Sequence, residues 1–490
     1  MTNPDRGKSK MITAIARKEF AEIVRDGRFK WTAAIMVLLL LTAMMAGYQK
    51  YSTAVRIQQA AQAGTNEQWL NQGDKNPHSA VHYGNYAFKP AGPLSYFDSG
   101  ISNYTGTAVF LEGHRQNFST GRPASDQSAI ARFGDLSGAN ILQLLLPLLI
   151  IFLGFTAFSG ERESGTLRQV MSMGVTNRQL LWGKALGVGF AVTIVVVPCI
   201  LIGTGVLALA ESTDHAEGMF MRVSALTIAY VMYAGIFLFL TLAVSAHTKQ
   251  ARTTLMILIG FWAFTGFLMP KAASEISKFT HPTPAFGKWM ADMKAHQRRG
   301  IDGTPPFVKF AAYTKELFKE YGVSSVGELP MYFVAVRLQK LEEYDYPVFD
   351  QHFGYINDTY TKQRKVQDTI GIVAPTLPLR SISMALSGTD MINHIKFMTD
   401  AETYRRNMVL KMNDYLSKAS VHLNDTFAAD NYMVADEEVF AIIPPFEYEP
   451  PRLAPMFAAH SSNFAMLFFW LLLSIGMAMV TSNRISMEGN

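Results

Sequence analysis

The sequence predicts an α-helical membrane protein with six transmembrane helices, both termini in the cytoplasm (N-in/C-in), and a large, mainly α (α+β) extracytoplasmic domain built from two insertions. Of the 490 residues, 49% are hydrophobic and 17% are charged, whereas a soluble domain carries roughly 25% charged residues. Six long runs contain no Asp, Glu, Lys or Arg. Each run is near the length, about 17 to 25 residues, that crosses a hydrocarbon core.

The predicted segments follow from these runs. In chain order they are a cytoplasmic amphipathic helix (1–30), a first span (31–48), a first extracytoplasmic insertion (49–138), a second span (139–158), a cytoplasmic loop (159–184), three further spans (185–210, 223–246 and 253–269), a second extracytoplasmic insertion (270–462), a sixth span (464–480) and a cytoplasmic tail (481–490).

The short loops set the predicted orientation, because Lys and Arg concentrate on the cytoplasmic side of a span. Basic residues are frequent in the first thirty positions and in the 159–184 loop, and Lys249 and Arg252 lie between the fourth and fifth spans. The loop from Glu211 to Arg222 instead carries three acids and one base. Both termini are therefore expected in the cytoplasm, and more than half of the chain outside it, as in a protein of a bacterial inner membrane.

The segment before the first span has an amphipathic helical pattern. Apolar and basic side chains alternate at helical spacing, and the set that defines this interface helix is Ile12, Ala16, Arg17, Lys18, Phe20 and Ile23. Such a helix can lie in the plane of the interface with its bases toward lipid headgroups. The alternative is a plain extension of the first span, which Gly27 disfavours.

The two insertions differ in character. The first opens with a helix-forming stretch that can continue the first span as a stalk, and then becomes rich in Gly, Pro and aromatic residues, which predicts irregular structure with short strands. The second favours helices at 307–322, 331–344 and 390–420, and an extended, proline-containing stretch after Phe440. If the flanking spans are neighbours, the two insertions build one joint domain.

The 159–184 loop contains helix start and stop signals. A turn is expected at Ser159 and Gly160, then a short helix from about Leu167 to Met173 that ends at Gly174. Two capping boxes are predicted, Thr166 with Gln169 and Thr176 with Gln179.

The short helix has an apolar face made of Leu167, Val170 and Met171. Such a face on a polar loop needs a surface to bury against. From physical arguments alone, that surface is as readily the protein's own membrane face or the lipid as a partner protein.

Two stretches resemble a known family. "ERESGTLRQVMSMGVTNRQLLWGK" (161–184) is similar to the cytoplasmic loop of bacterial ABC-2 type permeases, in which an acidic pair, a Gly-Thr-Leu step and a later Gly-Lys recur. "IARKEFAEIVRDGRFKW" (15–31) resembles the entry helix of that family. The likeness is closest to the group linked to maturation of multicopper enzymes, extended here by large outer insertions.

The resemblance implies a function and partners. The short helix would be a coupling helix that docks on a cytoplasmic ABC ATPase dimer, and two permease copies, identical or similar, would associate. The positions carried over as the ATPase contact are Glu161, Glu163, Gly165, Thr166, Leu167, Arg168 and Met171.

The chain is not expected to be an enzyme or to bind a cofactor itself. It lacks a Gly-x-x-x-x-Gly-Lys-Ser/Thr motif: at the Gly183–Lys184 step, Arg178 replaces the first glycine and Ala185 replaces the hydroxyl residue. ATP and Mg²⁺ are therefore assigned to a separate subunit. The spans also lack the ionisable residues of ion-coupled carriers, and no basic stripe suggests nucleic acid.

Other candidate sites carry less weight. His78 and His82 are four residues apart and His114 follows, but Gly84 and the surrounding aromatic residues argue against a helix there, so no metal site is expected. Glu342 and its neighbour Glu343 are expected on a solvated helix face.

The function predicted is that of the permease subunit of an ATP-driven ABC-2 exporter. The alternative is a mechanical transmitter whose outer domain acts on a periplasmic or envelope partner without moving a solute. A weaker third possibility is a membrane-anchored receptor without an ATPase. The substrate is not encoded visibly.

Overall fold

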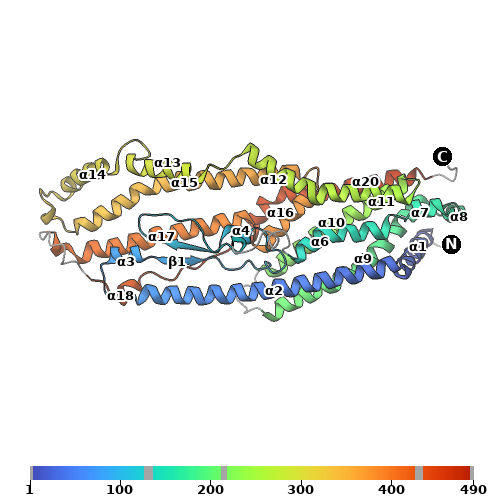
Figure 1. Cartoon of the computed structure of the whole chain (residues 1–490), viewed down its shortest axis with the longest axis horizontal. Helices are drawn as coiled ribbons and strands as arrows, with labels where there is room; N and C mark the ends of the chain where they lie inside the picture. Colours follow the sequence, from blue (N-terminus) through green and yellow to red (C-terminus); the bar gives the residue numbers. More distant parts are fainter. Residues whose placement is uncertain (1–3, 126–135, 211–217, 425–433, 486–490) are drawn as a thin grey trace.

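The computed structural model describes residues 4–125, 136–210, 218–424 and 434–485. Parts of five predicted segments lie outside the described residues: 1–3 of the amphipathic helix, 126–135 of the first insertion, 211–217 of the loop before the fourth span, 425–433 of the second insertion and 486–490 of the tail. The molecule is elongated, and both described ends of the chain lie at the same end of it (Figure 1).

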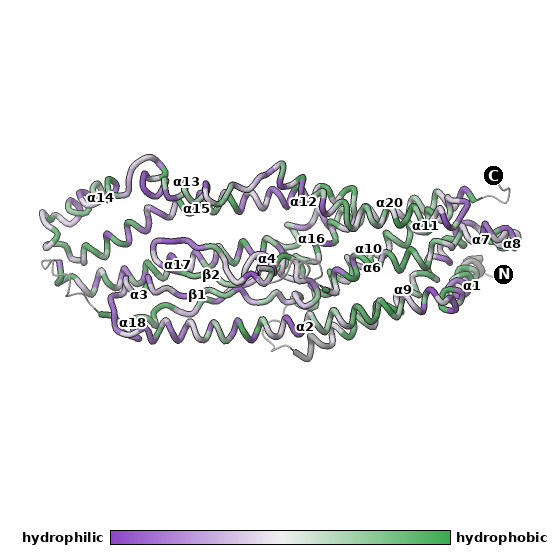
Figure 2. The backbone as a smooth tube through the Cα atoms, in the orientation of Figure 1, coloured by the Kyte–Doolittle hydropathy of each residue, from purple (hydrophilic) through white to green (hydrophobic). Residues whose placement is uncertain are grey.

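Six helices of the described chain are long and apolar enough to cross a membrane, and that all six do so stays a prediction. They are α2 (Gly27–Leu70), α6 (Gly138–Gly154) with α7 (Ser159–Glu163), α9 (Asn177–Ala210), α10 (Met219–His247), α11 (Ala251–Ala263) continued by the π-helical η3 (Phe264–Leu268) and α12 (Met269–Thr280), and α20 (Ser461–Asn483). Each contains one predicted apolar run. Figure 2 shows that hydrophobic residues dominate the half of the molecule that contains most of these helices and both chain ends.

The first span and the predicted stalk are a single helix. α2 has 44 residues, which corresponds to about 66 Å at 1.5 Å per residue. Its N-cap residue is Asp26, whose carboxylate accepts a hydrogen bond from the backbone N–H of Arg28. The second half of α2 runs beside the polar half of the molecule (Figure 1). One rigid element therefore connects the two ends of the protein.

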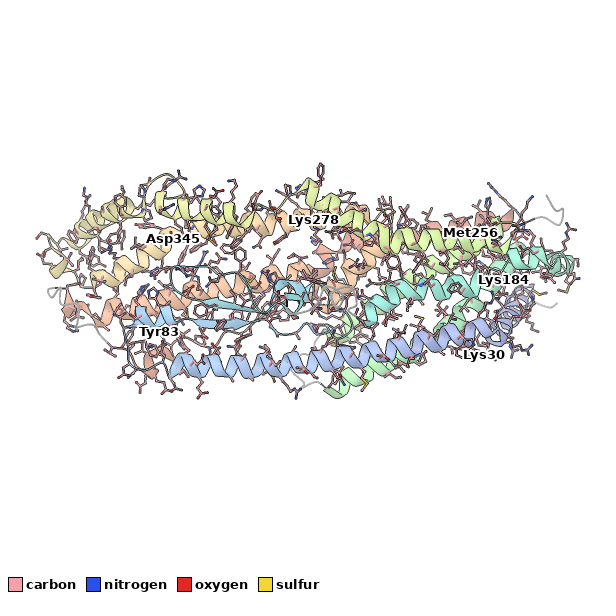
Figure 3. The ribbon with its side chains drawn as sticks, in the orientation of Figure 1. Lys30, Tyr83, Lys184, Met256, Lys278 and Asp345 are labelled. Atoms are coloured by element: carbon pink, nitrogen blue, oxygen red, sulfur yellow. The ribbon has the colours of Figure 1, made fainter. Side chains whose placement is uncertain are left out.

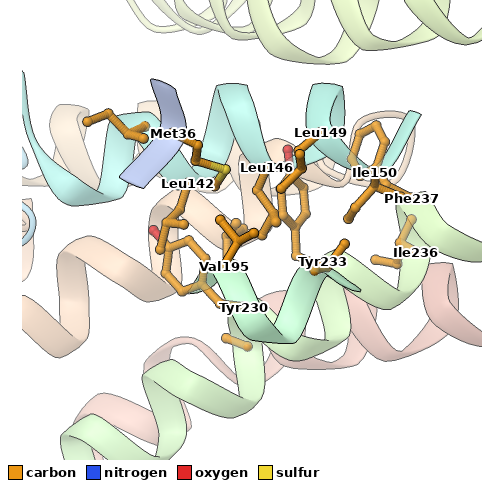
Figure 4. Packing of buried hydrophobic residues seen from close by; sticks show 14 of the residues in the cluster. Met36, Leu142, Leu146, Leu149, Ile150, Val195, Tyr230, Tyr233, Ile236 and Phe237 are labelled. Atoms are coloured by element: carbon orange, nitrogen blue, oxygen red, sulfur yellow. The ribbon is translucent and has the colours of Figure 1, made fainter. Parts of the chain in front are cut away.

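The apolar core of the spans is built around α6 and α10. Leu142 and Leu146 of α6 pack with the buried rings of Tyr230 and Tyr233 of α10 (Figure 4). Pro147 lies inside α6 and lacks the N–H that would bond to the carbonyl four residues earlier.

That freed carbonyl, on Gln143, accepts a hydrogen bond of 2.8 Å from the Tyr233 hydroxyl. A hydroxyl of α10 therefore replaces the missing backbone donor of α6, which satisfies a polar group that would otherwise be buried without a partner.

The polar half of the molecule is the distal region, defined as the described parts of residues 49–125 and 281–452. Its elements after α2 are α3 (Pro77–Tyr83), β1 (Asn85–Phe88), α4 (Ser102–Thr105), β2 (Ala108–Leu111), η1 (Pro123–Ser125), α13 (Phe286–Arg299), α14 (Pro306–Tyr321), η4 (Val326–Glu328), α15 (Phe333–Ile370), α16 (Thr376–Ser387), α17 (Met391–Ala419), η5 (Val421–Leu423) and α18 (Glu437–Phe440). α19 (Leu453–Ala459) then leads into α20.

The two insertions share one core, as predicted. Val81 and Val109 from the first insertion are buried against Met408 and Phe440 from the second, and the indole N–H of Trp69 donates to the backbone carbonyl of Phe440 at 2.9 Å. β1 and β2 form a two-stranded antiparallel sheet. The placement of this region outside the cytoplasm stays a prediction.

Several local predictions are confirmed and others are wrong. α14 and α17 lie where helices were expected, and the stretch after α18 is not helical up to Leu453. The helix predicted at 331–344 continues to Ile370, because Pro347 is accommodated inside α15. The segment around His78 is the helix α3 rather than irregular chain.

The N-terminal helix α1 (Pro4–Arg25) packs along the start of α9. Two glycines one turn apart on α9 make this possible. A Cβ on Gly183 would lie 2.5 Å from the Ile15 Cγ2 atom, and a Cβ on Gly187 would lie 2.6 Å from the Glu19 Cβ atom. Small residues at this spacing allow two helix backbones to approach closely.

Replacing Gly187 with alanine should therefore destabilise the protein, by about 1 to 3 kcal/mol, because the added methyl group overpacks the α1–α9 contact. The matched control is Gly189→Ala in the same helix, where a Cβ would meet its nearest neighbour at an ordinary 3.7 Å. Thermal unfolding of the purified proteins in detergent measures both effects. Equal melting temperatures for the two variants would contradict this packing.

Candidate functional site

The end of the molecule that holds α1, α7, α8 (Thr166–Ser172) and the end of α20 is called the terminal face. α7 takes the place of the turn predicted at Ser159 and Gly160. The Ser245 hydroxyl of α10 accepts hydrogen bonds from the backbone N–H groups of Phe158 and Ser159, at 3.0 and 3.1 Å. The start of α7 is thus anchored to the end of another span.

Glycines delimit α8 on both sides. Gly165 precedes it with φ 76° and Gly174 follows it with φ 79°, a left-handed conformation that favours glycine. The stop at Gly174 is as predicted.

One of the two predicted capping boxes is present. The Thr176 N–H donates to the Gln179 side chain at 2.9 Å and the Gln179 N–H donates to the Thr176 hydroxyl at 3.3 Å. The box predicted at Thr166 is wrong, because Thr166 is the first helical residue and its hydroxyl bonds to the backbone carbonyl of Glu161. Gly165 occupies the N-cap position instead.

A buried ion-pair network links three helices at the terminal face. The Lys184 ammonium of α9 lies 2.9 Å from a carboxylate oxygen of Glu19 on α1 and 3.0 Å from a carboxylate oxygen of Glu161 on α7. Lys18 of α1 reaches the same Glu161 oxygen at 3.0 Å. Figure 3 places Lys184 near this end of the molecule.

Three of the four charged side chains in this network are largely buried, so their pairing matters for stability. The side chains of Lys184, Glu19 and Glu161 are 1%, 9% and 13% exposed, whereas Lys18 is 47% exposed. A charge removed from water is costly unless it is paired. The position of α1 against α7 and α9 is therefore fixed by charge complementarity as well as by packing.

Glu163 and Arg162 connect the same segment to the turn between α10 and α11. The Glu163 carboxylate accepts the backbone N–H of Ala251 at 3.1 Å, at the start of α11. The Arg162 guanidinium donates to the backbone carbonyl of Ala246 at 2.9 Å and also to that of Thr248. Both members of the predicted acidic pair, Glu161 and Glu163, thus have partners within the chain.

The apolar face of α8 rests on the protein itself. Leu167 is buried in a cluster with Phe158 and Leu180, and Val170 and Met171 are half-buried against it. Of the two possibilities left open by the sequence, the structure realises burial against the protein's own membrane half.

The opposite face of α8 and its C-terminal end are exposed. Arg168, Gln169 and Ser172 face solvent, and the side chain of Met173 is 69% exposed. Sequence reasoning missed Met173 as a surface residue. The signal was its position just before the Gly174 stop, beyond the helix that could bury it.

α8 separates two hollows. One, of about 540 Å³, lies between α1, α6 and α8, and the predicted residues Glu161 and Thr166 line it. The other, of about 510 Å³, is lined by the remaining five predicted residues, Glu163, Gly165, Leu167, Arg168 and Met171, together with the bases Arg162, Lys249 and Arg484.

The predicted interface helix, α1, packs against α9 and α2, and its position in the plane of a membrane interface stays a prediction. Its buried line is Ile15, Glu19 and Ile23, turned toward α9 and α2, and the Phe20 ring packs edge-on against Phe190 at 5.3 Å. Of the other predicted residues, Ile12 and Ala16 are half-buried, Arg17 is exposed and Lys18 joins the ion-pair network.

A family model described as ABC-2 family transporter protein matches residues 13–484. The chain belongs to the ABC-2 transporter family. The match covers α1, the six apolar helices and the distal region together. Family membership identifies the chain as a membrane permease of the ABC-2 type.

Two similar proteins are each named probable ABC transporter permease protein NosY. The one from Pseudomonas aeruginosa is 28% identical over 163 residues, which are 31% of this chain and 56% of that protein. The one from Stutzerimonas stutzeri is 27% identical over 126 residues, 25% of this chain and 45% of that protein. The chain thus spans about half of the length of the curated relatives that it matches.

Replacing Lys184 with methionine should destabilise the protein by about 3 to 5 kcal/mol, because Glu19 and Glu161 would then be buried without their shared cation. Lys18→Met is the control, with an expected change of at most about 1 kcal/mol, because Lys18 is half-exposed. Thermal unfolding in detergent compares the two. Adding Glu19→Gln to Lys184→Met should recover part of the loss, and equal effects of the two lysine variants would contradict the network.

Proposed function

We propose that the chain is the permease subunit of an ATP-driven ABC-2 exporter, which couples ATP hydrolysis in a separate cytoplasmic ATPase to outward movement of a substrate. The observation that carries the proposal is the construction of α8. Its apolar face is anchored on the spans while its polar face, with Met173 beside it, is exposed at the terminal face. A helix held in this way can transmit a displacement to the spans only if a partner protein binds its exposed side.

The coupling path that we propose starts at α8 and α7. α7 is joined to α1 and α9 through Glu161 and Lys184, and to the turn before α11 through Glu163. A displacement of α8 would therefore move three helices together. α1 leads directly into α2, so the same displacement would reach the distal region.

The ATPase contact is narrower in this proposal than the sequence suggested. Arg168, Gln169 and Met173 form the contact, and Arg162, Lys249 and Arg484 around the neighbouring hollow offer positive charge to an acidic partner surface. Leu167 and Glu161 support the helix from within. ATP and Mg²⁺ bind in the partner, and two copies of the permease with two ATPase subunits make the complex.

A negative charge introduced at the exposed side of α8 should weaken binding to the ATPase encoded with this permease at least tenfold. Arg168→Glu and Met173→Glu are the test variants, and both should keep the melting temperature of the unmodified protein because the side chains are exposed. Arg299→Glu, an exposed arginine on α13 in the distal region, is the matched control. Binding and ATPase stimulation by detergent-purified proteins are the measurements; unchanged values for both α8 variants would refute the contact.

A second candidate is mechanical transmission to a periplasmic or envelope partner. It is favoured by the unbroken 44-residue α2 and by the tight packing between spans, where the cavity lined by Leu40, Leu142 and Tyr230 measures only about 60 Å³. In this form of the mechanism the distal region changes shape and no solute crosses between the spans.

Spin labels at Gln59 on α2 and Lys315 on α14, both exposed, separate the two candidates. The single native cysteine, Cys199, is buried and can be replaced by serine first. Transmission predicts that the distance distribution between the labels shifts between nucleotide-free and ATP-trapped complexes. An unchanged distance distribution, together with substrate accumulation in vesicles that contain the complex, would exclude transmission and support export.

A further inference from the structure

Three histidines converge in the distal region, far from the terminal face. His78 and His82 are one turn apart on α3, and His114 follows β2. The sheet register explains the convergence: Asn85, just after α3, pairs with Leu111, just before the His114 turn. Tyr83, the last residue of α3, is labelled at the end of the molecule away from Lys184 (Figure 3).

The three rings face one another with their Nε2 atoms. The His78 Nε2 atom lies 3.2 Å from His82 Nε2 and 3.3 Å from His114 Nε2, and one nitrogen of each ring falls within a group 4.8 Å across. A tetrahedral metal ion with metal–nitrogen bonds of about 2.0 to 2.1 Å separates its ligand nitrogens by about 3.3 to 3.4 Å. The two distances from His78 Nε2 therefore match the separation of two ligands of one ion.

A chain of hydrogen bonds fixes the tautomer of His78. The Glu343 carboxylate, which can only accept, receives the side-chain N–H of Gln339 at 3.1 Å. The Gln339 carbonyl then accepts from the Asn413 amide at 3.0 Å, which leaves the Asn413 carbonyl to accept from His78 Nδ1 at 2.8 Å. His78 Nδ1 therefore carries the proton and His78 Nε2 presents a lone pair.

His114 is oriented in the same way by a carboxylate. Its Nδ1 lies 2.6 Å from a Glu342 oxygen, and its backbone N–H donates to that oxygen as well. Glu342 is fully buried, contrary to the solvated position expected from the sequence, and pairs with Arg405 at 3.4 Å. With Nδ1 protonated, a neutral His114 also turns a lone pair toward His78 Nε2.

Two lone pairs at 3.3 Å repel each other unless a proton or a cation lies between them. A proton shared by His78 and His114 accounts for one of the two short contacts only. The His82 nitrogen converges on the same point, and a cation bound by all three nitrogens accounts for both contacts together. Histidine ligands of metals commonly donate their second N–H to a carboxylate or carbonyl oxygen, as His114 and His78 do here.

One further feature agrees with a built site. Among the described non-glycine residues, only His114 has a positive φ, 65°. Such a conformation costs energy and is found most often at functional sites.

We propose that His78, His82 and His114 bind one divalent transition-metal ion of the borderline class that favours imidazole, represented by Zn²⁺. His82 is exposed and His114 is half-exposed, so the ion enters from solvent and keeps an open fourth position. The supporting oxygens come from α15 and α17 of the second insertion, whereas the ligands come from the first. The bound ion would therefore link the two insertions indirectly, through the oxygens of the second insertion that hold its ligands from the first.

The test uses the full chain, purified in detergent with a tag that contains no histidine and stripped of metal by a chelator. Zn²⁺ alone is titrated by calorimetry, and Co²⁺ is added separately because its visible absorption reports tetrahedral coordination. We expect one equivalent of Zn²⁺ per chain. His82→Gln should lower the affinity at least tenfold and abolish the Co²⁺ spectrum, and because His82 is exposed this variant should keep the metal-free melting temperature.

The matched control is His296→Gln. His296 and His352 also face each other, at 2.9 Å between ring nitrogens, but among the described residues no third histidine completes a metal-binding group with them. Its Zn²⁺ affinity should equal that of the unmodified protein. Absence of Zn²⁺ binding by the unmodified chain would assign the gap to a proton and overturn the proposal, as would equal affinities for the His82 variant and the unmodified protein. Neither result bears on the exporter proposal.

Discussion

The arrangement of the terminal face depends on the buried ammonium of Lys184. This one group pairs with Glu19 of α1 and Glu161 of α7, and a buried carboxylate is costly unless it is paired. The close approach of α1 to Gly183 and Gly187 places Glu19 within reach. Packing and charge therefore favour the same arrangement of α1, α7 and α9. This arrangement also fixes the position of α8, which follows α7.

The elements that could be predicted from sequence are those specified by local patterns. Six apolar runs became six long helices, Gly174 ended α8, and the Thr176 capping box formed as expected. These features depend on a few neighbouring residues or on composition, so the sequence alone carries the information.

The features that could not be predicted are set by contacts distant in sequence. Glu342 was expected in solvent because its neighbours are charged, yet α17 and the His114 turn cover it completely. α3 was dismissed because of Gly84 and the aromatic residues around it, but Ala80 and Val81 of α3 are buried in the core shared with the second insertion. For the candidate site, sequence located α8 correctly but did not reveal which of its faces is free.

The Pro147–Tyr233 contact has a consequence for how this protein can change in evolution. If the proline is lost first, the helix regains its own backbone bond and the tyrosine hydroxyl still has Thr376 within 3.1 Å as a partner. If the tyrosine is lost first, the Gln143 carbonyl is left without its donor in an apolar interior, at a cost of about 1 to 3 kcal/mol. The order of the two substitutions therefore matters: replacing Pro147 before Tyr233 costs less stability than replacing Tyr233 before Pro147.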